Sequence, residues 1–86
     1  MAANYYAVSV GTTAILLAPA EAGSCSVYNN GTATIYVGFD AAVTTATGTP
    51  IVAGGSAGFS SNTYLPAIYG ISGTASQDTR VMLGVI

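Results

Sequence analysis

The sequence contains no histidine, no lysine and no tryptophan, one cysteine, and only four residues that are charged at neutral pH. These four are Glu21, Asp40, Asp78 and Arg80, and they give a net charge of −2. A single arginine cannot neutralise a series of phosphates, so we expect no nucleic-acid partner. Three carboxylates scattered along the chain and one cysteine do not provide a metal site or a set of disulfides. We therefore predict no metal and no cofactor.

The same absences argue against catalysis. A serine or cysteine nucleophile needs an adjacent base, and without histidine or lysine only the three carboxylates remain. Asp40 and Asp78 stand in contexts typical of turns and loops. The glycine-rich segment at Gly54 and Gly55 is followed by no lysine and opens no helix, so it indicates a hairpin turn and not a phosphate-binding loop. We predict that the protein is not an enzyme and has no catalytic residues.

Long hydrophobic runs are missing as well, although 51% of the residues are hydrophobic. The longest strictly apolar run is AILLAPA, at residues 14–20, whereas a membrane-spanning helix needs about 20 such residues. The N-terminal residues lack the basic segment and apolar stretch of a secretory signal. We therefore expect no membrane partner, and synthesis in a cytoplasm.

Turn-forming residues recur at short intervals, and the segments between them are rich in Val, Ile, Thr and Tyr, which favour strands. This pattern predicts an all-β protein: a single domain over residues 1–86, folded as a small antiparallel β-sandwich or barrel of about seven or eight short strands. The expected strands cover residues 5–10, 14–18, 23–28, 32–38, 50–53, 56–60, 67–72 and 79–86.

The segment VYNNGTATIYV, residues 27–37, has the strongest local hairpin signal in the chain, because Asn-Gly favours a tight turn. A three-residue loop over residues 29–31 separates apolar from polar side chains, and it pairs Cys25 with Ile35 on the apolar face. In this interpretation Cys25 is a buried small hydrophobe. Gly31 takes the left-handed position of a bulge, where asparagine is tolerated better than alanine.

The other face of this expected hairpin carries hydroxyl groups and no charge. Soluble monomers keep roughly a quarter to a third of their surface as charged residues, and a chain of this length buries only a small core. We therefore predict a homo-oligomer, most simply a trimer, in which this face is covered. The predicted interface residues are Tyr5, Tyr6, Ser24, Ser26, Tyr28, Thr34 and Tyr36.

The C-terminal segment TRVMLGVI alternates Val81, Leu83 and Val85 on one face with Arg80, Met82, Gly84 and Ile86 on the other. Both faces are largely apolar, and a bare apolar edge strand invites aggregation. We expect this strand to be central in a sheet or to be covered at an edge by a neighbour.

The order of several short motifs resembles that of small β-structured virion proteins of tailed bacteriophages. In that pattern a strand ending in Tyr-Val-Gly leads to Val-Thr, then Gly-x-Pro-apolar, a glycine-rich turn, an apolar-Tyr-x-Ile-Ser strand and a closing Arg-Val. The corresponding pieces here are residues 36–38, 43–44, 48–51, 54–55, 68–72 and 80–81, and they extend over most of the chain.

The resemblance implies a structural protein of the virion, made in the host cytoplasm and located on the capsid surface. Its expected role is that of a head decoration or cement protein, often trimeric, that binds and stabilises the lattice of the major capsid protein. A tail- or fibre-associated position is the nearest alternative. A third possibility is a carbohydrate-binding attachment module on the same sandwich, which would expose Tyr28, Tyr36 or Tyr64 beside Asp40 or Asn62.

Overall fold

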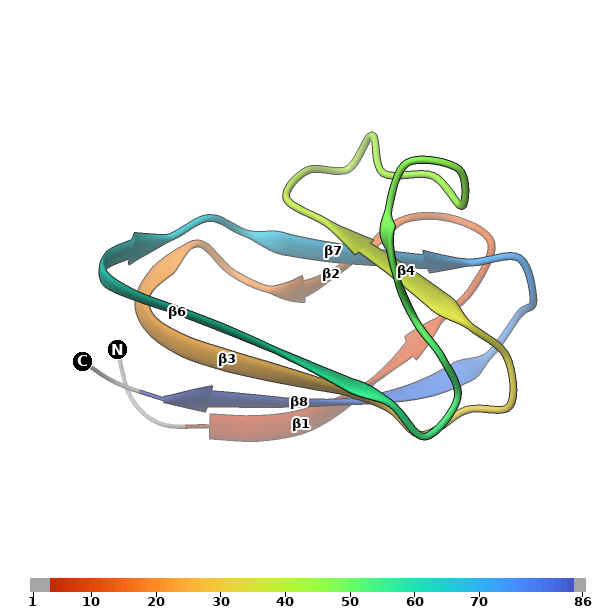
Figure 1. Cartoon of the computed structure of the whole chain (residues 1–86), viewed down its shortest axis with the longest axis horizontal. Helices are drawn as coiled ribbons and strands as arrows, with labels where there is room; N and C mark the ends of the chain where they lie inside the picture. The colour runs from red at the N-terminus through yellow and green to blue at the C-terminus, as the bar shows by residue number, and fades with distance from the viewer. Residues whose placement is uncertain (1–3, 85–86) are drawn as a thin grey trace.

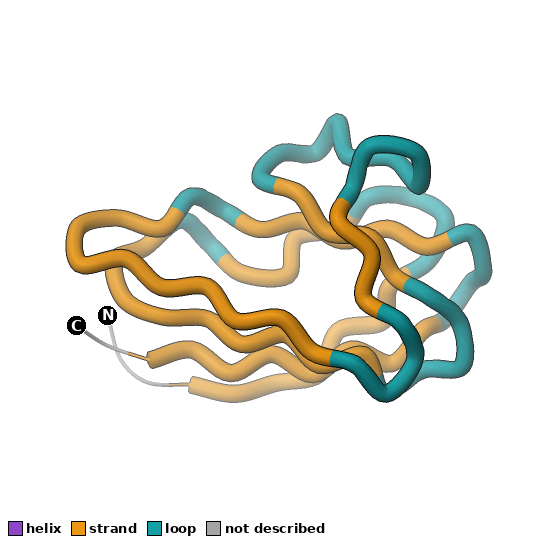
Figure 2. Tube along the Cα trace, in the orientation of Figure 1, coloured by secondary structure: helices purple, strands orange, loops and turns teal. Residues whose placement is uncertain are grey.

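The structure is a computed structural model. It describes residues 4–84, apart from the side chains of residues 21–22 and 61–64. Within this range the chain consists of strands and loops without a helix (Figure 2). The strands are β1 (Asn4–Val10), β2 (Ile15–Ala18), β3 (Glu21–Asn29), β4 (Ile35–Gly38), β5 (Thr49–Ile51), β6 (Ser56–Leu65), β7 (Ile68–Ser72) and β8 (Gln77–Gly84).

Each of these strands corresponds to one of the segments expected from the sequence, and the prediction of an all-β sandwich is confirmed. The largest difference is in β6, which continues five residues beyond the expected end at residue 60. The C-terminal strand is described as far as Gly84, so the expected positions of Val85 and Ile86 lie outside the described residues.

The strands form two four-stranded antiparallel sheets that pack face to face (Figure 1). Sheet A has the order β1-β8-β3-β6, and sheet B has the order β2-β7-β4-β5. The whole chain is in effect one long hairpin, with its tip at residues 39–48 and the pairs β4–β5, β3–β6, β2–β7 and β1–β8 along its arms. The hairpin is rolled up so that β3 also pairs with β8 and β4 with β7. This strand order is that of a jelly roll.

The core lies between the sheets and is formed by alternate residues of their strands. In β3, for example, Cys25 and Val27 are buried while Ser24 and Ser26 are exposed. The buried hydrophobic cluster comprises Val10, Leu17, Ala18, Cys25, Val27, Ile35, Val37, Ile51, Leu65, Ile68, Val81 and Leu83. The expected burial of Cys25 is confirmed, and burial raises the pKa of its thiol. The strand β8 is central in sheet A, which is one of its two expected positions.

The expected hairpin between residues 23–28 and 32–38 is wrong. The strand β3 belongs to sheet A and β4 to sheet B, so Cys25 pairs with Phe59 and Leu83, and not with Ile35. The Asn-Asn-Gly segment is therefore a connection that crosses from one sheet to the other. The glycine-rich turn at residues 52–55 likewise joins strands of different sheets, β5 and β6, rather than closing a hairpin. Turn-forming residues specify a change of direction, and they do not specify which strand pairs with which.

Asn29 holds these two crossing connections together, and it is completely buried. Its side-chain Nδ2 donates to the carbonyl oxygens of Ala33 and Ile51, at 2.8 Å each, while its Oδ1 accepts from the Gly31 N–H at 3.0 Å. The Asn29 backbone N–H donates to Gly55 O, and its backbone carbonyl accepts from Gly54 N–H. The side chain of Asn29 thus pairs backbone groups of the first connection and of β5, its backbone pairs the second connection, and the Ile51 carbonyl would otherwise be buried without a partner.

Gln77, at the start of β8, is the second buried polar side chain of this region. Its Oε1 accepts from the backbone N–H groups of Thr32 and Ala33, both at 2.8 Å, and its Nε2 donates to Ala75 O at 3.1 Å. Gly31 packs directly against it. A Cβ on Gly31 would overlap Gln77 Oε1 and lie 3.1 Å from Gln77 Cβ, so this position requires glycine for space. The expected left-handed conformation of Gly31 is wrong, because its φ lies outside that region.

Replacing Asn29 with alanine should destabilise the fold severely, whereas the same change at the neighbouring Asn30 should not. Asn29→Ala removes the partner of the buried Ile51 carbonyl and of two part-buried groups, Ala33 O and Gly31 N–H, and we expect a loss of about 3 kcal/mol in the free energy of unfolding. The Asn30 side-chain amide donates to Asp78 in an exposed hydrogen bond. Asn30→Ala should therefore lower the free energy of unfolding by about 0.5 kcal/mol or less. Urea titrations of the two variants provide the comparison, and equal losses would contradict the role given to Asn29.

Substitutions at Gly31 should distinguish the crowding by Gln77 from the left-handed turn that the sequence suggests. Gly31→Ala displaces the Gln77 amide and costs about 1–2 kcal/mol through its two backbone hydrogen bonds. Gly31→Asn is bulkier and should cost more than alanine. A left-handed position would give the reverse order. Thermal or urea unfolding of the two variants gives the order directly.

Candidate interaction surface

The outward-facing side of sheet A is an open surface without covering loops. Cross-strand registers place its residues in rows: Tyr5, Met82, Ser26 and Gly58 form one, and Ala7, Arg80, Tyr28 and Ser56 form the next. Gly84, Ser24 and Ser60 extend the surface toward the end of β8. We call these residues the outer face of sheet A.

Three large side chains stand above the small residues of this face. The exposed fractions are 80% for Tyr5, 64% for Met82 and 40% for Tyr28. The serine, glycine and alanine residues around them leave the backbone of the sheet close to the surface. Rigid aromatic rings and methionine on a flat surface of small residues are typical of the central part of a protein interface.

The chain's single basic residue also lies on this face. Arg80 Nη2 is 2.8 Å from Asp78 Oδ2, and Arg80 Nε donates to Asp78 Oδ1 at 3.1 Å. Asn30 Nδ2 donates to the same carboxylate at 2.9 Å. Hydrogen bonds from Arg80 and then from Asn30 hold the pKa of Asp78 below its usual 3.8, and Asp78 in turn raises the pKa of Arg80. The pair is exposed, so its contribution to stability is small, while arginine beside tyrosine is common at interface hot spots.

The structure brings four of the seven predicted interface residues together on the outer face of sheet A. These are Tyr5, Ser24, Ser26 and Tyr28. Thr34 and Tyr36 are not with them, because the hairpin that would have joined them to β3 does not exist. Thr34 lies on the connection to sheet B, where its carbonyl accepts from the Ser72 hydroxyl at 2.9 Å.

Tyr6 faces the opposite side of sheet A and packs against the core. Its hydroxyl donates to the carbonyl of Leu17 in sheet B at 2.5 Å, so this tyrosine ties the two sheets together. Adjacent residues of a strand point to opposite faces, and Tyr5 and Tyr6 therefore cannot both belong to the same interface.

Tyr36 lies on the outward side of sheet B, beside the loop of residues 39–48. Val43 of that loop is buried and lies over Gly38, where a Cβ would approach within 2.8 Å of the valine side chain. Gly48 packs equally closely against Tyr36. The loop thus covers part of sheet B and leaves Tyr36 half-buried, which makes sheet A the more open of the two sheets.

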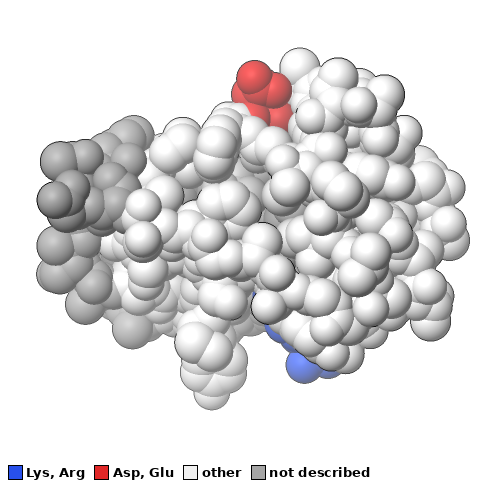
Figure 3. Space-filling view, in the orientation of Figure 1, with Lys and Arg blue, Asp and Glu red and all other residues white. Residues whose placement is uncertain are grey.

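The edge strand β1 of sheet A extends this surface and adds no charge to it. The strand β1 pairs with β8 on one side only, and its sequence NYYAVSV contains neither a charge nor a proline. Proteins that remain monomeric protect such edges with lysine, proline or a covering segment. Figure 3 shows that charged atoms on the visible side of the molecule are confined to small patches near its margins.

The described part of the chain contains no group of three or more residues that could hold a metal ion. In the same range, no helix is long and apolar enough to cross a membrane. Asp40 accepts from the Ala42 N–H at 3.0 Å and caps the loop that follows β4. The side chains of Tyr64 and Asn62, which the sugar-binding alternative invokes, lie outside the described residues.

Comparison with models of protein families, with curated proteins and with solved structures finds no match for this chain.

Sequence patterns alone miss two contributors to this face. Met82 alternates with the buried Val81 and Leu83, so its outward position follows from the pattern once β8 is known to be central in sheet A. The cluster of Asn30, Asp78 and Arg80 has no local signal, because Asn30 reaches Asp78 only through the alignment of β3 beside β8.

The melting temperature of the isolated protein should be nearly constant between pH 5.5 and 7.5. A carboxylate whose pKa is lower in the folded than in the unfolded state stabilises the fold above the unfolded pKa, and this contribution disappears as the pH falls through the folded pKa. For Asp78 that decrease begins below its usual pKa of 3.8. We expect less than about 2 °C of change between pH 5.5 and 7.5, or between low and high salt.

Calorimetry at pH 3, 5.5 and 7.5 tests this expectation, with Asp78→Asn as the control. The melting temperature of Asp78→Asn should fall less between pH 5.5 and pH 3 than that of the wild type. A shift of several degrees above pH 5 would mean that another carboxylate titrates in the fold.

Proposed function

We propose that this protein is a structural component of a protein assembly, and that it binds through the outer face of sheet A. The observation that carries the proposal is the combination of Tyr5, Tyr28 and Met82, all exposed, on an open sheet whose edge strand β1 has no charge. Left in water, such a face would be a site of non-specific association. In an assembly it is the surface that becomes buried.

The first partner in this proposal is a second copy of the chain. With a net charge of −2, two copies repel each other only weakly. The outer face of sheet A offers hydroxyl and apolar contacts to the same face of another copy. A homo-oligomer, as expected from the sequence, would bury the face without requiring a complementary charge on a partner.

The assembly we propose is the virion of a tailed bacteriophage, with the protein as a decoration or cement protein on the major capsid protein. Two observations support this proposal. The order of motifs resembles small virion proteins, and jelly rolls are common among viral capsid domains. The second argument is an analogy at the level of the fold, and the same fold also occurs in lectins.

Charged substitutions on the outer face of sheet A should dissociate the oligomer while leaving the fold intact. Met82→Lys or Tyr5→Lys places an unpaired charge in the proposed contact, which should weaken association by about a hundredfold. Val52→Lys is the matched control, because Val52 is 62% exposed on the β5–β6 connection and lies outside this face. Light scattering combined with size-exclusion chromatography measures the mass of each variant. A monomeric wild-type protein at micromolar concentration would contradict the proposed oligomer.

The virion assignment needs a separate test, since an oligomer alone does not identify the assembly. Particles purified from the source of this sequence should contain the chain in many copies, as counted by quantitative mass spectrometry, and antibodies against it should label the heads in electron micrographs. Labelling of tails would favour the tail- or fibre-associated alternative. Absence of the chain from purified particles would overturn the virion proposal.

A carbohydrate-binding module is the second candidate, and one observation favours it. Tyr28 is directly opposite Arg80 on the neighbouring strand, and Arg80 is paired with Asp78. An aromatic ring beside polar groups that can bind hydroxyls is a common arrangement in sugar sites. Binding on a glycan array that is lost in Tyr28→Ala and retained in Tyr36→Ala would support this candidate over the cement role.

A further inference from the structure

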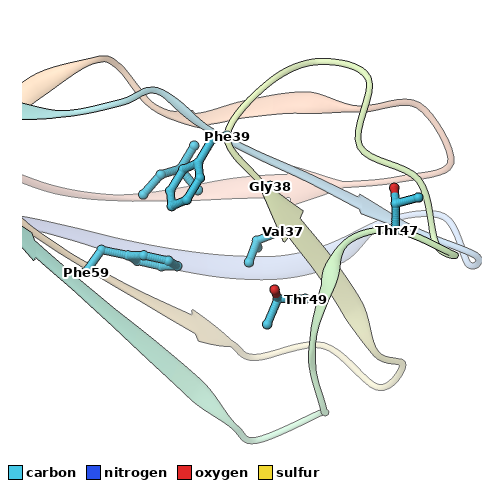
Figure 4. Close-up of a pocket in the computed structure, with 7 residues that line it drawn as sticks. Val37, Gly38, Phe39, Thr47, Thr49 and Phe59 are labelled. Atoms are coloured by element: carbon cyan, nitrogen blue, oxygen red, sulfur yellow. The ribbon is translucent and has the colours of Figure 1, made fainter.

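A pocket of about 240 Å³ opens between the two sheets, on the side away from the outer face of sheet A. Residues of β4, β5, β6 and β7 and of the loop before β5 line it: Val37, Gly38, Phe39, Thr47, Thr49, Phe59 and Ile68. Figure 4 shows the ring of Phe39, which follows the end of β4, and the ring of Phe59, in β6, projecting toward the same space. Their centroids are 6.0 Å apart in an edge-to-face arrangement.

The pocket results from unequal edge strands. The edge strand β6 of sheet A has ten residues, whereas the edge strand β5 of sheet B has only three. Phe59, on the inward side of β6, therefore extends beyond the part of sheet B that could cover it. Phe39 fills only part of the gap and remains 55% exposed. Burying these aromatic surfaces against a ligand would be favourable.

The wall of the pocket next to the loop is fixed by hydrogen bonds. Thr44 N–H donates to Thr47 Oγ1 at 3.1 Å, and the two threonine hydroxyls lie 2.9 Å apart. Gly48 N–H donates to Thr44 O at 2.8 Å. A site that is already formed loses little conformational entropy when a ligand binds.

The lining determines the kind of ligand. None of the seven residues carries a charge, so an ionised group would be buried without a partner. The hydroxyl of Thr47 is engaged with Thr44, whereas the hydroxyl of Thr49 has no partner among the described residues. Apolar cavities of about 150 Å³ accept a benzene ring, and this pocket is larger.

We propose that the pocket is a binding site for a neutral aromatic ring that bears one hydrogen-bonding group, of about the size of phenol or indole. The ring packs against Phe39 and Phe59, and its polar group bonds to Thr49 Oγ1. The ring can be a free small molecule or a tyrosine side chain of another protein, since both present the same chemistry. This proposal is independent of the proposed assembly, because it uses the gap between the sheets and not the outer face of sheet A.

The experiment is a titration of the ¹⁵N-labelled protein, followed by NMR, with phenol and separately with the capped peptide acetyl-Ala-Tyr-Ala-amide. We expect shifts of the Val37, Gly38 and Thr49 amides and a dissociation constant of about 1 mM for phenol, which is within the range that ligands of this size reach. Comparable binding of the peptide identifies a protein side chain as the source of the ring, and binding of phenol alone identifies a small molecule. No shift of these amides with either probe at 10-fold this concentration, about 10 mM, overturns the proposal.

Two variants at one position locate the site. Thr49→Trp fills the pocket and should weaken phenol binding by about tenfold or more, while Thr45→Trp, on an exposed loop position outside the lining, should not. Thr49→Val keeps the shape of the side chain and removes its hydroxyl. It should weaken phenol by a few fold and leave toluene unchanged. Unaltered phenol binding in Thr49→Trp, with a native spectrum, would place the ligand elsewhere and overturn the assignment.

Discussion

The fold depends on the hydrogen bonds of one buried asparagine. Within the described residues, the connection between β4 and β5 stays within a sheet, and every other connection between consecutive strands crosses from one sheet to the other. Each crossing segment leaves the hydrogen-bonded ladder, so those of its backbone groups that are shielded from water need other partners. Asn29 pairs backbone groups of the β3–β4 connection and of the end of β5, where the next crossing begins. Gln77 pairs a further backbone N–H of the β3–β4 connection. The sandwich is closed at this end by polar groups rather than by apolar packing.

This arrangement has a consequence for the surface. Since the loop of residues 39–48 covers part of sheet B, and the crossing segments cover the end of the sandwich, sheet A retains an open outer face. The core consists of a dozen modest side chains, and the sequence carries only four charged residues. Self-association and capsid binding, as proposed, are two ways of burying this face, whose one basic residue is already paired with Asp78.

Local structure was predictable from the sequence, and strand pairing was not. Alternation and turn residues located all eight strands and the burial of Cys25, because these depend on neighbours within a few residues. They left β8 either central or covered at an edge, and its place between β1 and β3 decides for the first. The partner of β3 depends on residues 56–65 and 77–84, which lie far along the chain, and the Asn-Gly signal at residues 30–31 favoured a hairpin that the roll does not contain. For the same reason the predicted interface residues before and after the Asn-Gly segment are separated, because β3 lies in sheet A and β4 in sheet B. The pocket between Phe39 and Phe59 could not be anticipated, since it arises from the difference in length between two edge strands.

The position of β8 between β1 and β3 determines when the protein can fold during its synthesis. Sheet A lacks its central strand until residues 77–84 have left the ribosome, and until then β1 has no partner in the sheet. The nascent chain therefore cannot complete a domain in stages from its N-terminus, as larger proteins do. Its apolar segments stay accessible until β8 has been made, and pairing between strands that lie far apart in the sequence slows the final step. A protein of this topology gains from rapid release and from chaperones that bind unfolded chains.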